Sequence, residues 1–515
     1  MEEIQVNPFI PMALLSLLLL LSITRIFLKS SSKKKLPPSP PKLPIIGNLH
    51  QLGSSLPHRS LHSLAKKHGP LMLLHFGSVP VLIRRRCLLR ETSLTVSSAE
   101  FAREIMVTHD TTFANRPRFK AMMKLVYGCR DVAFLPYGEY WRRLRSIVVL
   151  QLLSNKRVQS YSAIREEEAA LIVKKVLETS GNTAVDLSAM FESFSNDVIG
   201  RSAFGGKLSD SENGKKFLEA MADLMKLLGI IDIGDFIAWL GWIGRVNGFD
   251  RRLDDTAKRI DLVLESVIQE RMLEKKGVKE ESGEHFVDIL LDIYNHTTLD
   301  VSIDRDSLKA IILDVFVGGT DTISTAMEWT MSELLRHPIV MEKLQLEVRG
   351  IVKQNLEITD DDLQKMHYLK AVIKEAMRLH PPVPLLVPRL ASKDVQVKGF
   401  DISAGTIVMI NAWAIGRDPV SWGEPETFMP ERFLNSSIDF KGLDFELIPF
   451  GGGRRGCPGI TLASAGMELL LADLLQKFDW NLAKGVEPKD LDMSESPGMT
   501  VHRVVPLVAL ASPAT

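Results

Sequence analysis

Hydrophobic and polar positions alternate along most of the chain with the spacing of an α-helix. Between Asp304 and Arg336, apolar side chains recur every three to four residues, and Pro338 stops the run. One helix of this length would be roughly 50 Å long, enough to cross a whole domain. A second apolar stripe covers Tyr368 to Leu379 and ends at two prolines. The pattern predicts a mainly helical protein with one long central helix.

Three short runs have the composition of β-strands rather than helices. They are Leu71 to Phe76, Val79 to Ile83 and Thr406 to Ile410. They predict small β-sheets beside the helices. No internal repeat is visible, and no later change in composition marks a second domain. We therefore expect residues 51–515 to form one large folded unit.

The amino terminus differs from the rest of the chain. Pro8 to Leu28 is almost purely apolar, and as a helix its 21 residues would span roughly 30 Å, the thickness of a bilayer core. Lysines follow this stretch and two glutamates precede it, which predicts that the body faces the cytosol. A cleaved signal peptide is the alternative, but the basic residues come after the apolar stretch and no small-residue cleavage site closes it. Residues 1–28 are thus expected to be a single-pass membrane anchor.

A basic and proline-rich segment, residues 29–50, follows the predicted anchor. Its centre, Leu36 to Pro44, reads LPPSPPKLP. Such proline density favours a stiff, extended spacer over a helix. This hinge would hold the folded unit at a fixed angle to the membrane.

Composition narrows the functional classes. The chain is 45% hydrophobic and 24% charged, and its formal net charge is zero. Basic and acidic residues balance, so nothing in the charge points to nucleic acid as a partner. The three cysteines are Cys87, Cys129 and Cys457. They are too few for a disulfide framework and fit a reducing compartment.

Cys457 lies in a glycine-rich loop with two arginines. The loop matches the pattern F-x-x-G-x-R-x-C-x-G through Phe450, Gly453, Arg455, Cys457 and Gly459. Glycines allow tight turns that bring N–H groups near the sulfur, and such groups stabilise a thiolate. A thiolate that binds heme iron favours O–O cleavage, and the arginine can pair with a heme propionate. The alternative is a structural turn that buries a cysteine.

Two further motifs precede this loop. Glu375 and Arg378 form E-x-x-R on the second predicted helix, where residues three apart share a face. Pro430 to Phe433 reads PERF and includes Arg432. Together with the cysteine loop, and in this order, these motifs resemble those of a cytochrome P450, and the anchor and hinge make the resemblance closest to microsomal, plant A-type members. The resemblance covers essentially the whole chain.

The resemblance implies the cytochrome P450 fold, with heme b between the long central helix and the cysteine loop. It implies that Glu375, Arg378 and Arg432 form a buried structural triad. It also implies that Trp141, Arg145, Arg389 and Arg455 bind the heme propionates, with Phe450 and Gly453 shaping the loop around the Cys457 ligand.

On the opposite side of the heme, the resemblance assigns the stretch Gly318 to Thr322. Here the central helix would widen into a groove for dioxygen, with Thr322 bonding the oxygen and Asp321 relaying protons. Ile323 departs from the usual Thr or Ser at that position. The alternative is an Asp-Thr pair that caps a broken helix.

Three arginines remain without a role. We expect Arg142, Arg143 and Arg454 to form a basic face for an acidic electron donor, which the resemblance identifies as NADPH–cytochrome P450 reductase.

Arg84 to Thr95 interrupts the pattern of the family. A strand usually runs straight into the following helix here, and deleting these residues would join Val81-Leu82-Ile83 directly to Val96. Four arginines are also poor strand material. We interpret residues 84–95 as an insertion; a genuine surface loop near the substrate entrance is the alternative.

The sequence thus predicts a heme-thiolate monooxygenase of the endoplasmic reticulum membrane, which uses O2 and NADPH-derived electrons on a small hydrophobic substrate. Two alternatives stay open: a heme-dependent lyase such as an aldoxime dehydratase, and a non-catalytic heme protein inactivated by the insertion. The resemblance draws the pocket from four segments, which are Ala121 to Phe134, Asp314 to Gly318, Pro382 to Leu386 and Gly498 to Val501.

Overall fold

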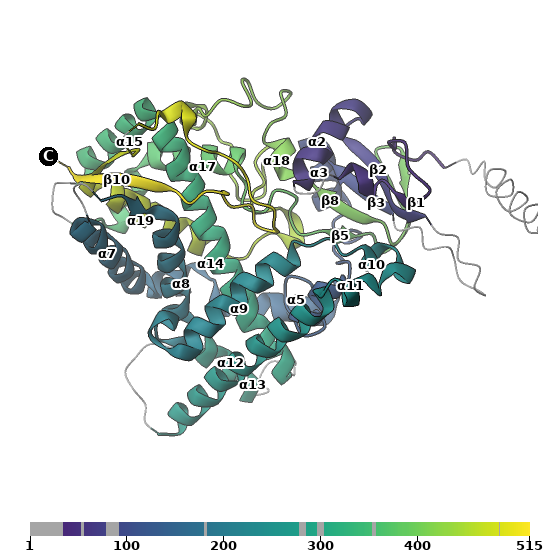
Figure 1. The fold of residues 1–515 in the computed structure, drawn as a ribbon, viewed down its shortest axis with the longest axis horizontal. Coiled ribbons are helices and arrows are strands. Elements are labelled where there is room, and N and C mark those ends of the chain that lie inside the picture. Colours follow the sequence, from purple (N-terminus) through teal and green to yellow (C-terminus); the bar gives the residue numbers. More distant parts are fainter. Residues whose placement is uncertain are drawn as a thin grey trace, which may run out of the picture.

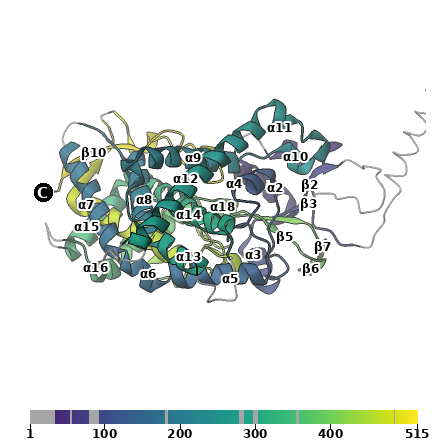
Figure 2. The same cartoon turned by 90° about the horizontal axis from the view of Figure 1, so that it is seen from below.

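Helices fill most of the molecule, and a β-sheet lies at one end (Figure 1). The computed structural model describes residues 34–52, 56–78, 92–179, 183–277, 285–295, 303–352, 357–483 and 485–514. The molecule is broad in Figure 1 and thinner when turned by 90° (Figure 2). This architecture confirms the mainly helical fold with small sheets.

Helix α14 (Arg305–Arg336) runs through the centre of the molecule (Figures 1 and 2). Asp304 caps its N-terminus, because its side chain accepts a hydrogen bond from the Ser307 N–H. The helix ends just before α15 (Pro338–Ile351). The apolar stripe predicted from the sequence is buried. The long central helix is therefore confirmed.

Other helices pack around α14, with α8 forming its most extensive contact. The predicted second stripe is α17, which begins at His367 and ends at Leu379, as expected. The longer helices are α5 (Glu139–Ile147), α7 (Ser162–Thr179), α8 (Leu187–Phe204), α9 (Glu212–Leu228), α12 (Phe249–Gly277), α13 (Phe286–Asn295) and α19 (Ile460–Lys477). The shorter ones are α2 (Pro57–His68), α3 (Ala99–Arg103), α4 (Lys120–Leu125), α6 (Asn155–Ser160), α10 (Ile233–Phe236), α11 (Ile243–Val246), α16 (Asp360–Lys365) and α18 (Ala412–Ile415).

The largest sheet has the strand order β1-β2-β3-β8-β5. Its strands are β1 (Ile45–Gly47), β2 (Leu71–Ser78), β3 (Thr92–Val96), β8 (Ile407–Ile410) and β5 (Arg389–Leu390). Only the β3–β8 pairing is parallel; the other pairs are antiparallel. The expected strands at residues 71–76 and 406–410 are thus present.

Two smaller sheets complete the fold. One has the order β4-β10-β9 and the other pairs β6 with β7. Their strands are β4 (Val185–Asp186), β10 (Val508–Pro513), β9 (Phe478–Asn481), β6 (Val395–Val397) and β7 (Phe400–Ile402). The first of them ties the C-terminal segment to α8 and α19, at the end of the molecule opposite the large sheet (Figure 1).

Strand β3 changes the interpretation of the predicted insertion. Because β3 pairs with both β2 and β8, it is an inner strand of the sheet. The last four residues assigned to the insertion, 92–95, are therefore part of the sheet and not of a bulge. The preceding residues 79–91, which include the expected strand Val81-Leu82-Ile83, lie outside the described residues.

The proline-rich hinge lies against the large sheet where the structure describes it. The Leu73 N–H donates to the Pro38 carbonyl at 2.9 Å, and the Asn48 side chain donates to the Pro41 carbonyl at 3.1 Å. Strand β1 falls inside the range predicted as hinge. The folded unit therefore begins several residues before residue 51.

Among the described residues, α14 is the one helix that is long and apolar enough to cross a membrane. Most of it is buried inside the protein, as expected of a central core helix. The predicted anchor, residues 1–28, lies outside the described residues.

Candidate active site

The cysteine loop is fixed by hydrogen bonds of its own backbone. It leads from Phe450 through a short 3-10 helix, η7 (Gly453–Arg455), to the start of α19. The Cys457 N–H donates to the Phe450 carbonyl at 2.9 Å. The Gly459 N–H donates to the Cys457 sulfur at 3.3 Å. The second bond is the expected one, because an N–H donor aimed at the sulfur stabilises its thiolate form.

Gly453 is required by the shape of this loop. Its φ is +65°, in the left-handed region, and a Cβ there would overlap the Met106 carbonyl oxygen. The loop therefore packs directly on the backbone that follows α3, and only glycine fits.

Cys457 lines a cavity, and its side chain is accessible. Burial raises the pKa of the thiol, while the Gly459 N–H and the charge of Arg145 act to lower it. A bound metal cation would complete the stabilisation of the thiolate. The other described cysteine, Cys129, is buried in the hydrophobic core and does not line this cavity.

The cavity has a volume of about 290 Å³ and lies between the cysteine loop and α14. Cys457 lies on one wall, and Gly318, Gly319 and Thr322 lie on the α14 wall. Three of the four predicted pocket segments contribute lining residues, namely Val132, Ala133, Asp314, Val315, Gly318, Pro382, Val383 and Leu386. None of the residues 498–501 lines it.

Helix α14 is continuous through the stretch from Gly318 to Thr322. The Thr322 hydroxyl donates to the Gly318 carbonyl at 2.7 Å, one turn earlier. A Cβ on Gly318 would meet no atom within 4 Å, so this glycine leaves open space beside the helix. A Cβ on Gly319 would press on Ile199 of α8 at 2.7 Å. Gly318 therefore leaves open space at the cavity, whereas Gly319 allows α14 to pack closely on α8.

Asp321 does not line the cavity. Its carboxylate points to the C-terminal segment, where it forms an ion pair of 3.0 Å with His502. Thr322 and Asp321, which the sequence predicts to act together, therefore face different sides of α14. Nothing in the motifs signals His502, which lies outside all of them.

Guanidinium groups gather at one end of the cavity. Arg145, Arg389 and Arg455 were expected here, and Arg116 joins them. The Arg455 guanidinium lies over the Trp141 ring at 4.2 Å. The structure thus brings together all four predicted propionate-binding residues. Arg116 was not among the predicted site residues, and its position in the fold places it in the cluster.

These buried cations lack enough anions. Arg455 donates to the carbonyls of Ala114, Val132 and Leu135, which are neutral acceptors. Among the described residues, the buried Arg389 Nη1 atom has no hydrogen-bond acceptor, and it forms an ion pair with Asp110 at 3.5 Å.

The arginines also disfavour one another's charge. Burial lowers the pKa of Arg455 to about 9, and the charge of Arg389 acts in the same direction. Burial, with the charges of Arg389 and Arg455, likewise holds the pKa of Arg116 well below its usual range. A buried cluster of this kind is complete only with an anionic ligand. A heme, with two carboxylates at one edge and iron at its centre, fits both the cluster and the cysteine.

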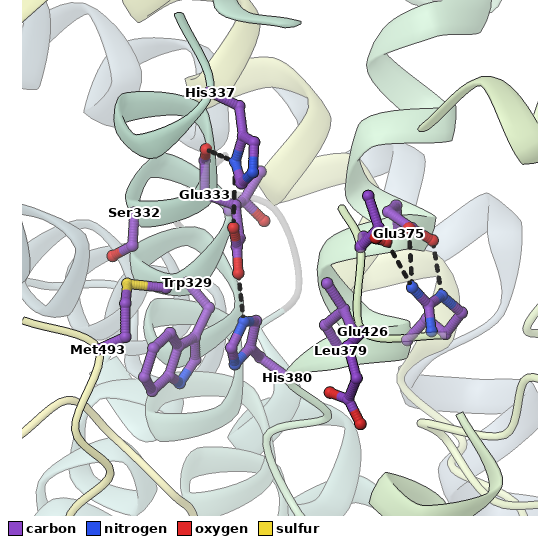
Figure 3. Close-up of polar contacts among 12 residues, drawn as sticks. Trp329, Ser332, Glu333, His337, Glu375, Leu379, His380, Glu426 and Met493 are labelled. Atoms are coloured by element: carbon purple, nitrogen blue, oxygen red, sulfur yellow. Dashed lines mark hydrogen bonds and ion pairs between the residues drawn. The ribbon is translucent and has the colours of Figure 1, made fainter. Parts of the chain in front are cut away.

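The predicted structural triad forms a buried cluster beneath the site. Arg378 and Glu375 pair at 2.7 Å and are both fully buried, and Arg432 reaches Glu375 at 3.0 Å. Figure 3 shows Glu375 on α17, and across the view Glu333 between His337 and His380. None of these residues lines the cavity, so their geometry is structural.

A carboxyl pair was not anticipated from the sequence. Asp314, on the cavity wall, accepts hydrogen bonds from the Val132 N–H at 2.6 Å and the Ala133 N–H at 3.3 Å, and it lies beside Asp131. Burial raises the pKa of Asp314 to about 6. Burial and the charge of Asp314 raise the pKa of Asp131. Both shifts favour a proton shared by the pair, and the hydrogen bonds of Asp314 fasten the loop before α5 to α14.

Comparison with known proteins agrees with this geometry. The family model of cytochrome P450 matches residues 37–506. "Cytochrome P450 71A8" of Mentha piperita is 55% identical, over 99% of this chain and 97% of that protein. "Norfluorocurarine oxidase" of a Strychnos species is 49% identical, over 98% of both chains.

The fold is likewise similar to that of a solved enzyme. A zebra fish cytochrome P450, solved with abiraterone, has a TM-score of 0.73 and 25% sequence identity over 90% of this chain and 100% of that one. The thiolate loop, the arginine cluster and these likenesses have one explanation: the chain belongs to the cytochrome P450 family, as a plant A-type monooxygenase that holds heme through a cysteine thiolate.

Proposed function

We propose that this enzyme transfers an oxygen atom from O2 to a small hydrophobic plant metabolite, with electrons from NADPH that arrive through cytochrome P450 reductase. One observation carries the proposal. A single cavity holds the Cys457 sulfur on one wall and the Thr322 side chain on the opposite wall. When bound between them, heme supplies the chemistry of O2 activation.

Each part of the chain has a defined task in this proposal. Cys457 provides the thiolate, and the Gly459 N–H steadies its charge. Trp141, Arg145, Arg389 and Arg455 hold the propionates, and Arg116 adds a further donor at the same edge. Phe450 and Gly453 shape the loop. Thr322 offers a hydroxyl to the cavity, and Asp321 supplies protons from the other side of α14.

The lining of the cavity supports a hydrophobic substrate. Away from the arginines, its side chains are mostly aliphatic and include Val148, Leu153, Val315, Val383 and Leu462. The Strychnos relative is named as an oxidase of norfluorocurarine. A compact, largely apolar plant metabolite fits this lining.

A test of the proposal is the reduced carbon monoxide spectrum of the purified enzyme. We expect the thiolate-type Soret band in the wild type and its loss in Cys457→Ser. Cys129→Ala is the matched control, because Cys129 lies outside the cavity, and it should keep the band. Absence of the band in the wild type would leave only a non-catalytic heme protein.

Oxygen dependence separates oxygenation from dehydration. Compounds that shift the heme spin state would first be selected from a panel of terpenoids, phenylpropanoids and aldoximes. Turnover of a selected compound should require both O2 and NADPH. Turnover under argon at an undiminished rate would instead establish a lyase.

The proposed docking face for the reductase contains Arg142 and Arg143 on α5 and Arg454 in the cysteine loop. Arg142 is exposed, Arg143 pairs with Glu139, and Arg454 pairs with Asp110 at 3.2 Å. Helix α5 contacts the cysteine loop, because Arg145 donates a hydrogen bond to the Gly456 carbonyl at 2.5 Å. Reversing the charge of Arg142 and Arg143 should slow reduction at low salt. The same reversal at Arg251 and Arg252 on α12 is the control, and equal rates for both double variants would exclude this face.

We place the enzyme at the endoplasmic reticulum membrane, with its folded unit in the cytosol. Apolar side chains are exposed between α9 and α12, namely Ile230, Ile231, Trp239, Trp242 and Val246. Leu43 and Ile45, which follow the predicted anchor in the sequence, are also exposed. The rings of Phe236 in α10 and Phe76 in β2 pack edge to face with their centroids 5.2 Å apart, so these two groups share one end of the molecule (Figure 1). An apolar surface of this kind suits contact with lipid.

A further inference from the structure

His502 reaches Asp321 from a part of the chain remote in sequence. It lies between helix α19 and strand β10, while Asp321 lies midway along α14. The His502 Nε2 and Asp321 Oδ1 atoms are 3.0 Å apart. The other ring nitrogen, Nδ1, is 3.0 Å from the Thr325 hydroxyl. Both nitrogens therefore have partners on the same helix.

The hydrogen-bond pattern favours a charged imidazole. The Thr325 hydroxyl is only 2.6 Å from the Asp321 carbonyl, one turn earlier, so its single proton goes to that carbonyl. Its oxygen then accepts from the His502 Nδ1–H. Since Nε2–H donates to the carboxylate, both ring nitrogens carry protons, and His502 is an imidazolium.

The surroundings of His502 agree with this charge. Burial acts to lower the pKa of the ring, but the hydrogen bond and charge of Asp321 outweigh burial. The charges of Glu328 on α14 and Glu192 on α8 raise the pKa further, so it lies above its ordinary value. The next residue, Arg503, has the same charge as the imidazolium, but it bonds Ser332 and acts on Glu328 instead.

The backbone around His502 is held in place. The Val501 N–H donates to the Pro382 carbonyl at 2.9 Å, and the Trp329 indole N–H donates to the Val501 carbonyl at 2.9 Å. The His502 carbonyl accepts from the Ser496 N–H at 2.8 Å. These bonds fix the ring against α14, so its position does not depend on a mobile segment.

The Asp321 carboxylate is held between His502 and Thr500. Burial acts to raise the pKa of Asp321, but the hydrogen bond and charge of His502 and a hydrogen bond from Thr500 outweigh burial, so the pKa lies below its ordinary value. The His502 side chain is 36% exposed, whereas that of Asp321 is 23% exposed. A proton can thus enter from solvent at the imidazole and continue to the carboxylate.

We propose that His502 is the positioning and proton-donating partner of Asp321, which holds the carboxylate in place and resupplies it with protons from solvent. In each transfer, the imidazolium gives the Nε2 proton to the carboxylate and becomes neutral, and water restores the proton to the ring. The proposal rests on the proposed oxygenase function, since only a reaction that consumes protons at the cavity needs such a supply.

The test compares His502→Gln with His337→Gln in the full chain. The glutamine introduced by H502Q keeps a hydrogen-bond donor for Asp321 but cannot transfer a proton at these pH values. His337 is the matched control, because it also pairs with a carboxylate on α14, Glu333 at 3.3 Å, and does not line the cavity (Figure 3). Both variants should keep the wild-type carbon monoxide spectrum.

The H502Q variant should turn over substrate about tenfold more slowly, with a changed pH profile and more NADPH electrons recovered in hydrogen peroxide. H337Q should match the wild type in all three. Wild-type turnover, pH profile and peroxide yield in H502Q would overturn the proposal, as would equal losses in both variants. Loss of the spectrum in the wild type would instead refute the proposed function itself.

A measurement without turnover tests the pair directly. A double-mutant cycle of H502Q and D321N on chemical unfolding should show coupling at about pH 6, where the imidazolium is present in both folded and unfolded chains. Because the folded-state pKa of His502 is raised, the coupling should vanish as the pH rises through that pKa. Coupling that is absent at about pH 6, or the same at all pH values, would overturn the charged pair.

Discussion

At residue 453 the site depends on the absence of a side chain. We expect Gly453→Ala to lower the free energy of unfolding by more than about 3 kcal/mol and to prevent heme retention, because the new Cβ would overlap the Met106 carbonyl. Gly405→Ala is the control, since Gly405 has φ +80° but nothing within 4 Å of a Cβ. Both changes carry the cost of a positive φ, so the difference in thermal unfolding isolates the overlap. Equal losses would show that the loop can move aside.

The carboxyl pair of Asp131 and Asp314 gives stability a pH dependence. The folded-state pKa of Asp314, about 6, is above its unfolded value of about 3.9. The stabilisation that the protonated carboxyl gives the folded state is therefore complete below the unfolded pKa and is lost as the pH rises through about 6. We expect the free energy of unfolding to fall by about 1.4 kcal/mol between about pH 5 and 7.5. Asp314→Asn should remove that fall, as measured by urea unfolding; a parallel pH dependence in the variant would contradict the shared proton.

The residues that sequence could reveal are those with fixed spacing. Cys457, Arg455 and Gly453 share one loop, so their pattern identifies them together. Arg116 and His502 have no such neighbours, and only the folded chain brings each to the cavity or to α14. Asp131 and Asp314 lay within two of the expected pocket segments, but their pairing could not be inferred without the packing of the loop on α14.

At the scale of elements, the length of a periodic pattern decides what can be predicted. The stripe of α14 fixes both ends to within one residue, because its many apolar positions agree and Asp304 caps it. Strand β3 has five residues, too few apolar positions for the pattern alone to fix which residues form it. Ser93-Leu94-Thr95 fills the inner strand that Val81-Leu82-Ile83 was expected to occupy, and either triplet is compatible with the position before Val96.

The strand β3 therefore provides its own test of the insertion. Ser93 and Thr95 are fully buried, and their hydroxyls lack hydrogen-bond partners among the described residues. Deleting residues 84–95 would place Val81-Leu82-Ile83 there and remove both hydroxyls, each of which costs about 1–3 kcal/mol. We expect the deletion variant to unfold at a higher temperature and to keep its heme. A lower unfolding temperature would show that residues 84–95 belong to the native strand connection.

At the scale of the whole molecule, the two ends of the chain's long axis have different surfaces. The end with α10 and α11 exposes Trp239 and Trp242, each more than half accessible, while Trp480 in β9, next to β10 at the other end, is buried (Figure 1). We predict that lipids carrying a bromine quencher reduce tryptophan fluorescence of the full chain in vesicles, because the exposed indoles lie in the membrane interface. Replacing Trp239 and Trp242 by Phe should abolish most of that quenching, whereas Trp480→Phe should leave it unchanged. Equal quenching in both variants would mean that the molecule meets the membrane through another face, and the apolar surface between α9 and α12 would then need a different partner.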